Sequence, residues 1–469
     1  MFNSDIVINN LGPISKANIN LKNLTVFVGQ NNTGKTYLLS CLFFFQTNDF
    51  KKILSEIIKD NTNRYSFNNN DFSIKDSQKI LENIFNDISK IDVLDSMNFN
   101  ASNYINKSTF QFSVPEIVKN DIYLVSDVIS KDNILVNTIL KLIMNKKKVK
   151  DVFDMLNLPS SKMMQDESYF NKFTKFMVSV FGINDAHEMF LRSICFKFFN
   201  LQHDKERSSY MFPVERAGIN KFFYEAIYKL NETNLALKSF IEFKLKLNND
   251  TLNNQFNKTS FYDIARTLET ELFKGGKIWN EKISENTFQI IFFNKDNQKF
   301  TLDNFSSSIN ELSVFILYLK YYAKEGDVIF IDEPEISLHP DSQRILVRFL
   351  SELSKIGLKF VIITHSDYIV KELNNLICIK DISSENKISL KHYYSEKNEL
   401  DYNLTRVYSI YEEENDVVIR QAEEGEYGFE EKLFTNAINS ISGDSNKIFS
   451  LIQSNFGEKI NINIEELYE

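Results

Sequence analysis

The sequence is poor in cysteine, in long apolar runs and in net positive charge, and each shortage excludes a class of protein. Its three cysteines, Cys41, Cys195 and Cys378, lie far apart without C-x-x-C spacing, which excludes a disulfide framework and a cysteine-based zinc cluster. No apolar run approaches the roughly 18 residues that span a bilayer, and no basic segment followed by an apolar core opens the chain. These absences predict a cytoplasmic protein with no membrane partner.

The charge balance bears on nucleic acid as a partner. The formal net charge is −9, so the chain is not basic all over, although a local basic groove could still meet DNA. DNA is therefore possible but not indicated. The sequence also lacks a fixed-period repeat and a long heptad run, which argues against extended coiled-coil arms.

Apolar and aromatic residues, in contrast, are plentiful. Apolar residues make up 43% of the chain and include 42 Phe and 20 Tyr, so a large core is expected despite the many Asn and Lys residues. At 469 residues the chain exceeds the size at which one core stops growing. We therefore expect either one enlarged domain with a big insertion or two domains.

One short stretch carries the clearest chemical signal. Residues 24–28 are the apolar run LTVFV, and residues 29–36, GQNNTGKT, match the pattern G-x-x-x-x-G-K-[ST]. In such a strand, loop and helix, backbone N–H groups surround a polyphosphate at the positive end of the helix. We predict an ATP site in which Lys35 contacts the β- and γ-phosphates and Thr36 offers its hydroxyl oxygen to Mg²⁺. Its binding residues are expected to be Gly29, Asn31, Asn32, Thr33, Gly34, Lys35 and Thr36.

A second segment ends in two adjacent carboxylates. Residues 327–333, DVIFIDE, predict a buried strand, and the carboxyl ends of parallel strands are where such sheets place their sites. We expect Asp332 to hold Mg²⁺ through water and Glu333 to accept a proton from the water that attacks the γ-phosphate. An apolar run before Asp-Glu is a weak signal alone, and it becomes strong after a phosphate loop.

A third segment, residues 360–366 (FVIITHS), predicts the next buried strand, with a helix at 342–355 between the two. A lone histidine is more often structural than catalytic. At this strand end, however, we expect His365 to hydrogen-bond the γ-phosphate or the attacking water.

The segment 305–311, FSSSINE, precedes an amphipathic helix. Ser308 and Glu311 have the spacing of a capping box, and a capped helix is the simpler interpretation. Three successive hydroxyls at a helix N-terminus also suit an anion. We expect Ser306, Ser307 and Ser308 to meet the γ-phosphate bound by a second subunit.

These segments predict an α/β fold in which a mixed sheet with flanking helices forms an ATPase head with a large helical insertion. We divide the chain into an N-terminal lobe (1–46), a helical insertion (47–205), a C-terminal lobe (206–380) and an α/β extension (381–469). Within the insertion, apolar residues recur at helical spacing, and the basic run 146–150 is interpreted as a solvated helix end. We assign the insertion and the acidic extension to recognition of partners.

With these residues in view, the order of phosphate loop, insertion, serine-led helix, D-E-P-E at 332–335, L-H-P at 338–340 and T-H-S at 364–366 resembles ABC-type P-loop ATPases of the RecF/SMC/Rad50-like class. Within that class it is most similar to the overcoming-lysogenization-defect branch. The segments 212–216 (FPVER), 306–308 and 365–368 (HSDY) resemble the stand-alone ATPases of anti-phage systems such as PARIS and Septu. The likeness covers roughly residues 1–45 and 205–380.

This resemblance implies a homodimer or higher homo-oligomer with ATP between the Lys35 loop of one head and the serines of another. It also implies a sensor that responds to a phage-derived trigger and controls a separate effector protein, expected to be a nuclease. Residues 381–469 contain no D-x-D pair, so we do not predict a nuclease in this chain. Two alternatives stay open, namely a DNA-maintenance ATPase and a scaffold in which ATP is only structural.

Overall fold

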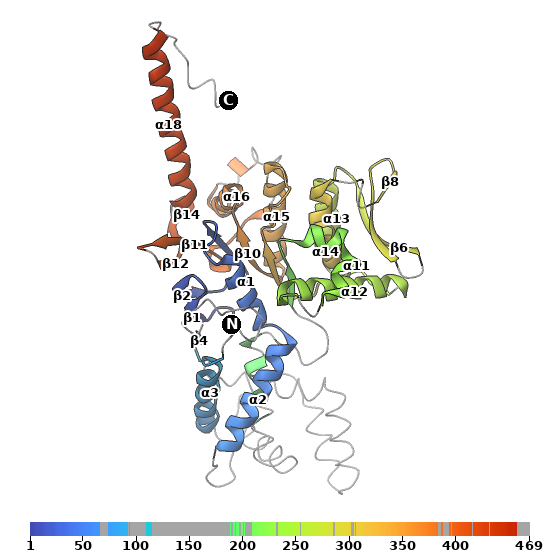
Figure 1. Cartoon of the computed structure of the whole chain (residues 1–469), viewed down its shortest axis with the longest axis vertical. Coiled ribbons are helices and arrows are strands. Elements are labelled where there is room, and N and C mark those ends of the chain that lie inside the picture. Colours follow the sequence, from blue (N-terminus) through green and yellow to red (C-terminus); the bar gives the residue numbers. More distant parts are fainter. Residues whose placement is uncertain are drawn as a thin grey trace.

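Figure 1 shows the computed structural model of the chain. The structure describes residues 1–65, 74–91, 109–114, 209–230, 233–253, 255–284, 287–301, 306–382, 396–414, 416–430 and 432–456, with short runs and single residues at 93, 188, 191–192, 194–196, 198–199, 201, 304, 386–387 and 394. No helix in this part of the chain is long and apolar enough to cross a membrane.

A nine-stranded mixed sheet forms the centre of the molecule. Its spatial order is β4 (Thr109–Phe112), β1 (Asp5–Leu11), β2 (Ile14–Asn20), β12 (Asp416–Gln421), β11 (Thr405–Glu413), β3 (Leu24–Gly29), β10 (Lys359–Thr364), β9 (Val328–Asp332) and β5 (Ser209–Phe212). The five strands from β11 to β5 run parallel, whereas β1 pairs antiparallel with both β2 and β4. The predicted α/β fold with a mixed sheet is confirmed.

Both faces of the sheet are covered, and the alternation of side chains along β3 shows how. Leu24, Val26 and Val28 point into one apolar core, and Phe27 points into the other. This double burial is why residues 24–28 are apolar except for Thr25, whose hydroxyl donates to the Lys22 carbonyl oxygen. The core that contains Phe27 receives α1 (Lys35–Phe44), α2 (Asn48–Arg64) and α3 (Ile74–Ile88).

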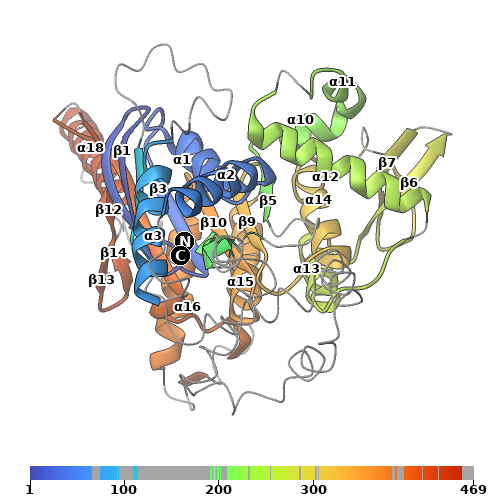
Figure 2. The same ribbon diagram turned by 90° about the horizontal axis from the view of Figure 1, so that it is seen from below.

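The core that contains Leu24, Val26 and Val28 carries the other described head helices (Figure 2). These are α10 (Arg216–Lys221), α11 (Phe223–Tyr228), α12 (Leu235–Leu252), α13 (Tyr262–Leu272), α14 (Ser307–Tyr321), α15 (Pro340–Lys355) and α16 (Asp367–Cys378). A small antiparallel sheet of β6 (Lys277–Ser284), β7 (Thr287–Phe293) and β8 (Lys299–Phe300) flanks α12. Strands β7 and β8 pair as an antiparallel hairpin.

The C-terminal region completes the chain. Three 3-10 turns, Ile379–Asp381, Glu396–Asn398 and Tyr402–Leu404, lead into β11 and β12. They are followed by the hairpin of β13 (Glu423–Gly425) and β14 (Gly428–Glu430). The last helix, α18 (Lys432–Phe456), projects away from the sheet (Figure 1).

Two of the predicted segments differ from those in the structure. The insertion is not wholly helical, because β4 extends the sheet beside β1. The region after residue 380, predicted as a separate α/β extension, contributes strands to the head sheet, because β11 pairs with β3 and β12 pairs with both β11 and β2. Within the insertion, the apolar residues Ile53 and Ile57, which lie at helical spacing, are part of α2. The apolar residues near Ile139, also at helical spacing, and the basic run 146–150 lie outside the described residues.

Candidate active site

The phosphate loop lies between β3 and α1 and has the backbone that its glycines require. Gly34 has φ of 83° and Asn32 has φ of 63°, both in the left-handed region. A Cβ atom on Gly29 would lie 2.6 Å from the carbonyl oxygen of Ile410 in β11. Glycine is therefore needed at position 29 for close packing against β11 and at position 34 for the backbone turn into α1.

Lys35 is buried and points back into the loop. Its Nζ donates hydrogen bonds to the Gln30 carbonyl oxygen and to Thr33 Oγ1. Burial lowers the pKa of Lys35, while the nearby carboxylates of Glu333 and Asp332 oppose that shift. The ammonium group is thus held by loop oxygens that a polyphosphate could replace as its partner.

Thr36 and Asp332 bring the phosphate loop and the acidic strand together. Thr36 Oγ1 donates to Asp332 Oδ2 at 3.0 Å. Asp332 is 1% exposed, and its Oδ1 is buried without a hydrogen-bond partner. Burial, with repulsion from Glu333 and Glu215, raises the pKa of Asp332 to about 6. A buried carboxylate oxygen without a partner, next to a hydroxyl, fits Mg²⁺, which takes one or two protein ligands and several from phosphate and water.

The described residues contain no group of three or more His, Cys, Asp or Glu side chains that could hold a metal ion.

Glu333 and His365 face each other across the ends of β9 and β10. Their side chains are 29% and 31% exposed, and His365 Nε2 lies 3.5 Å from Glu333 Oε1. Burial and the charge of Lys35 lower the pKa of His365, although Glu333 opposes the shift, so the imidazole is neutral at pH 7. Both groups remain accessible to water, as a general base must be.

The backbone sets the direction of Glu333. Its φ is 48°, and its N–H donates to the Ile363 carbonyl oxygen at 3.0 Å. A glutamate in the left-handed region is uncommon, and such strain is typical of sites where surrounding structure fixes a side chain.

One known protein family matches most of the chain. The AAA ATPase domain family matches residues 1–370 of the chain. The chain belongs to this family.

Solved structures with some likeness are heads of SMC proteins. The Smc head domain of Pyrococcus furiosus, bound to the C-terminal domain of ScpA, is 11% identical, with a TM-score of 0.34, over 95% of this chain and 99% of that chain. The SMC head domain from Thermotoga maritima is also 11% identical, with a TM-score of 0.33, over 90% of this chain and 100% of that chain. No curated protein matches the sequence.

Arg216 is a site residue of this AAA ATPase domain to which the sequence alone gave no role. It is 2% exposed, and its guanidinium donates to the carbonyl oxygens of Asp332 at 2.8 Å, Glu333 at 2.9 Å and Pro213 at 3.0 Å. Its Nε lies 3.0 Å from the Glu311 carboxylate. Arg216 therefore fixes the backbone that carries both acids, and its place directly after β5 was the available signal.

Glu335 is a second positioning residue that the sequence did not reveal. It is a largely buried carboxylate whose Oε1 accepts hydrogen bonds from the His365 N–H at 2.5 Å and the Thr364 hydroxyl at 2.8 Å. These bonds orient the end of β10 and so the imidazole. The acidic residue three positions after Asp332 was the only hint of this role.

The serine segment is not brought to the phosphate loop of the same chain. α14 lies with α12 and α13, apart from α1 (Figures 1 and 2). Ser306 and Ser307 are exposed, and the hydroxyls of Ser306 and Ser308 lie 2.9 Å apart.

The predicted capping box is wrong. The N-cap of α14 is Ser306, so Ser308 lies inside the first turn. Glu311 does not reach back to the cap, because its carboxylate pairs with Arg216. A buried cation competes for a carboxylate more strongly than one backbone N–H does.

Proposed function

We propose that this AAA ATPase domain binds ATP with Mg²⁺ and hydrolyses it. The observation that carries the proposal is the 3.0 Å hydrogen bond from Thr36 to Asp332, which joins the phosphate loop to the acidic strand beside Glu333 and His365. We assign the nucleotide to the loop residues 29–36, as the sequence predicts.

Each side chain then has a role that its position supports. Lys35 exchanges its loop carbonyl for phosphate oxygens, and Glu333 accepts a proton from the attacking water while neutral His365 donates a hydrogen bond to the γ-phosphate or that water. Mg²⁺, when bound by Thr36 and Asp332, neutralises charge that develops on the phosphates. Arg216 and Glu335 hold Glu333 and His365 in place without touching substrate.

Two variants test the assignment separately. Lys35→Ala should lose binding of a fluorescent ATP analogue. Glu333→Gln should keep that binding and slow single-turnover hydrolysis by about 100-fold or more, because general-base catalysis is worth this much. Glu271→Gln, an exposed site far from the loop in sequence, is the matched control. Hydrolysis by Glu333→Gln at the parent rate would refute its role as base.

We also propose that heads pair, with the γ-phosphate of one subunit meeting Ser306, Ser307 and Ser308 of another. The support is the exposed serine cluster at the start of α14, which has no place in the ATP site of its own chain. Mixing inactive variants decides the matter. Lys35→Ala and Ser308→Arg chains should regain hydrolysis when mixed, because one composite site is then intact.

The control mixture combines Lys35→Ala with Glu333→Gln. Lys35 and Glu333 both belong to the subunit whose phosphate loop holds the ATP. Every composite site in this mixture therefore carries one of the two defects, and the mixture should stay inactive. Recovery of ATP hydrolysis in both mixtures, or in neither, would refute the composite site. Light scattering with a non-hydrolysable analogue should show a dimer or higher homo-oligomer.

For the biological role we propose the sensor subunit of an anti-phage system, which responds to a phage component and controls a separate nuclease. The support is the motif likeness of residues 212–216, 306–308 and 365–368. A cytoplasmic location stays a prediction from the sequence.

A nuclease gene beside this one, whose product co-purifies with the chain, would support the sensor role. A DNA-maintenance ATPase would instead bind DNA with a steep salt dependence. A scaffold would keep its assembly in the Glu333→Gln variant.

A further inference from the structure

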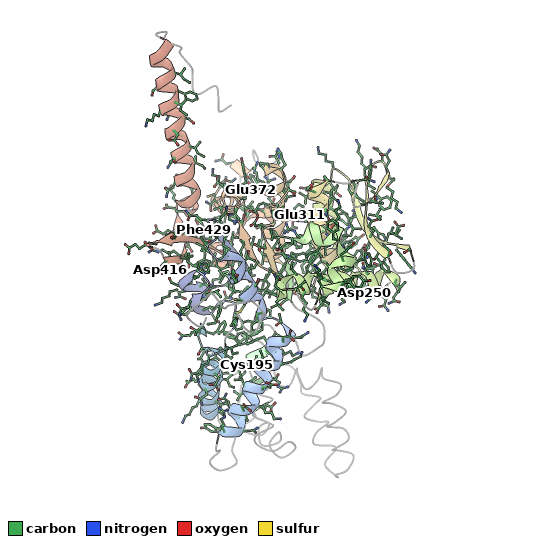
Figure 3. All side chains as sticks on the ribbon, in the orientation of Figure 1. Cys195, Asp250, Glu311, Glu372, Asp416 and Phe429 are labelled. Carbon is green, nitrogen blue, oxygen red and sulfur yellow. The ribbon has the colours of Figure 1, made fainter. Side chains whose placement is uncertain are left out.

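A second concave site lies in the lobe of α12, α13 and α14. It is a cavity of about 1000 Å³ between the C-terminal half of α12, the loop 255–260 and the end of α14. Figure 3 labels Asp250, one of its lining residues, on α12. None of the residues assigned to ATP lines it, and its volume is at the upper end for small-molecule sites.

The loop wall of this cavity is fixed by hydrogen bonds to helix ends. Thr259 donates its N–H to the Lys320 carbonyl oxygen at 3.0 Å and its hydroxyl to the Leu319 carbonyl oxygen at 2.6 Å. The Gln255 N–H donates to the Asp250 carbonyl oxygen at 3.0 Å. The loop is therefore tied to both α14 and α12, and the cavity is preformed.

Aromatic rings form part of the lining. Phe256 and Tyr321 are half-buried, with ring centroids 4.7 Å apart. The Phe256 ring also lies 6.4 Å from Tyr322, which lines the same cavity. The planes of Phe256 and Tyr321 are tilted by 45°, so a flat group can stack on the face of one ring while it touches the edge of the other.

Lysines also line the cavity, and the ammonium groups of two of them lie over neighbouring tyrosine rings. Lys246 Nζ lies 5.3 Å from the centroid of Tyr322, and Lys258 Nζ lies 4.4 Å from that of Tyr262. Both lysines are exposed, and neither forms a salt bridge within the described part of the chain. Lys324 also lines the cavity.

Two carboxylates share the lining, and one of them is already engaged. Asp250 accepts a hydrogen bond from the Tyr322 hydroxyl at 2.8 Å, and exposed Glu325 lies at the rim. The balance of lysines over carboxylates favours an anion.

We propose that this cavity binds a nucleotide, with its base stacked on Phe256 and Tyr321 and its phosphate held by Lys246 and Lys258. Aromatic faces beside lysines suit a planar base that carries phosphate, whichever base it is. A free nucleotide and one unit of a single strand share this chemistry. The site is independent of ATP hydrolysis by the head.

The test uses the full chain with Lys35→Ala, so that the phosphate loop does not take up the probe. Two fluorescent probes are titrated, a labelled AMP and a labelled 12-nucleotide oligothymidylate. Adding Lys246→Ala with Lys258→Ala should weaken binding of at least one probe tenfold or more. The matched control, Lys282→Ala with Lys295→Ala, removes the same charge from exposed positions on the β6–β8 side and should change nothing.

The probes distinguish the two sources, because a strand site prefers the oligothymidylate and a free-nucleotide site prefers AMP. For the strand, the slope of log affinity against log salt should fall by about 1.4 when two phosphate contacts are lost. Phe256→Leu, which keeps apolar volume and removes the ring, should also weaken binding. The proposal is overturned if neither probe binds the Lys35→Ala chain, or if the two double variants bind equally well.

Discussion

At the scale of single residues, Arg216 is the group on which the acidic end of β9 depends most. Arg216→Met leaves the Glu311 carboxylate buried without its cation and removes the donors to the carbonyl oxygens of Asp332 and Glu333. We expect the free energy of unfolding to fall by about 3–5 kcal/mol, as for other broken buried ion pairs. Urea denaturation measures it.

The double variant Arg216→Met with Glu311→Gln tests the reason for that loss. It should recover part of the stability, because the second change removes the unpaired buried charge. If the double variant were less stable than Arg216→Met by the full cost of changing Glu311 alone, the two residues would not be coupled.

Asp332 should make nucleotide binding depend on pH. Its pKa of about 6 lies above the ordinary value of 3.8, so the folded chain takes up this proton more readily than the unfolded chain does. The free energy of unfolding therefore falls as Asp332 ionises with rising pH through 6, and a bound cation offsets that loss. We expect the apparent Mg²⁺ affinity of the ATP complex to fall about tenfold per pH unit below 6.

The control for this pH dependence is Asp332→Asn. ATP itself titrates in the same range, and the variant shares that contribution but lacks the carboxylate. Its Mg²⁺ affinity should be lower at pH 7.5 and should fall less steeply on acidification. Equal slopes for the parent chain and the variant would show that Asp332 is not the group that titrates.

The residues that sequence could identify are those whose chemistry follows from a local pattern. The loop 29–36, Asp332 and Glu333 sit at the ends of apolar runs, and the structure brings Thr36 to Asp332 and Glu333 to His365. Arg216 could not be assigned, because its partners Glu311, Asp332 and Glu333 lie 95 to 117 positions away along the chain.

At the scale of elements, the stability of a Ser308 variant distinguishes two interpretations of the start of α14, a capping box and an ordinary surface position. A true capping box would lose about 1 kcal/mol on Ser308→Ala. Because the N-cap is Ser306 and Glu311 is held by Arg216, we expect a change within about 0.5 kcal/mol, the usual range for a surface position. Thermal or urea unfolding of the variant measures it.

Glu311→Ala is the contrasting variant within the same helix. It removes the buried partner of Arg216 and should destabilise the chain clearly more than Ser308→Ala does. Equal losses of unfolding free energy in the two variants would contradict this prediction and support a capping box formed by Ser308 and Glu311. A stable Ser308→Ala chain with reduced ATP hydrolysis would agree with the proposed composite site.

Element types followed from periodicity where the pattern was long. The spacing of apolar residues shows which faces of a helix or strand are buried. It predicts elements that the structure has as the helices α2 and α15 and the buried strands β3, β9 and β10. Strand β4 was not predicted, because its four residues are too few to show an alternation of apolar and polar side chains. It forms by pairing with the edge strand β1.

At the scale of the whole molecule, the C-terminal strands should be indispensable for folding. Truncation after residue 380 removes β11 and β12, which leaves β3 without one of its two neighbours. We expect that chain to be insoluble or unfolded by circular dichroism. Truncation after residue 430 removes only the segment 431–469, which includes α18, and should keep a folded, ATP-binding head.

The shorter truncation is therefore the control for the longer one. A folded, nucleotide-binding chain that ends at residue 380 would show that β11 is dispensable. Loss of folding in both chains would mean that α18 supports the head. Partner binding by the chain that ends at residue 430 would place recognition outside α18.

The order of the strands within the sheet could not be predicted from the sequence. The run at 405–413 predicts no partner by itself, and its pairing with β3 crosses almost the whole length of the chain. Such long-range pairing depends on packing, not on local propensity.

The pairing of β11 with β3 has a consequence for synthesis on the ribosome. The strand before the phosphate loop is synthesised long before its neighbour β11. Until residues 405–413 leave the exit tunnel, one edge of β3 is open, and open edges invite wrong pairing. The phosphate loop of a nascent chain therefore hangs on a strand with an unpaired edge until β11 has been made, and the chain is exposed to aggregation during that interval.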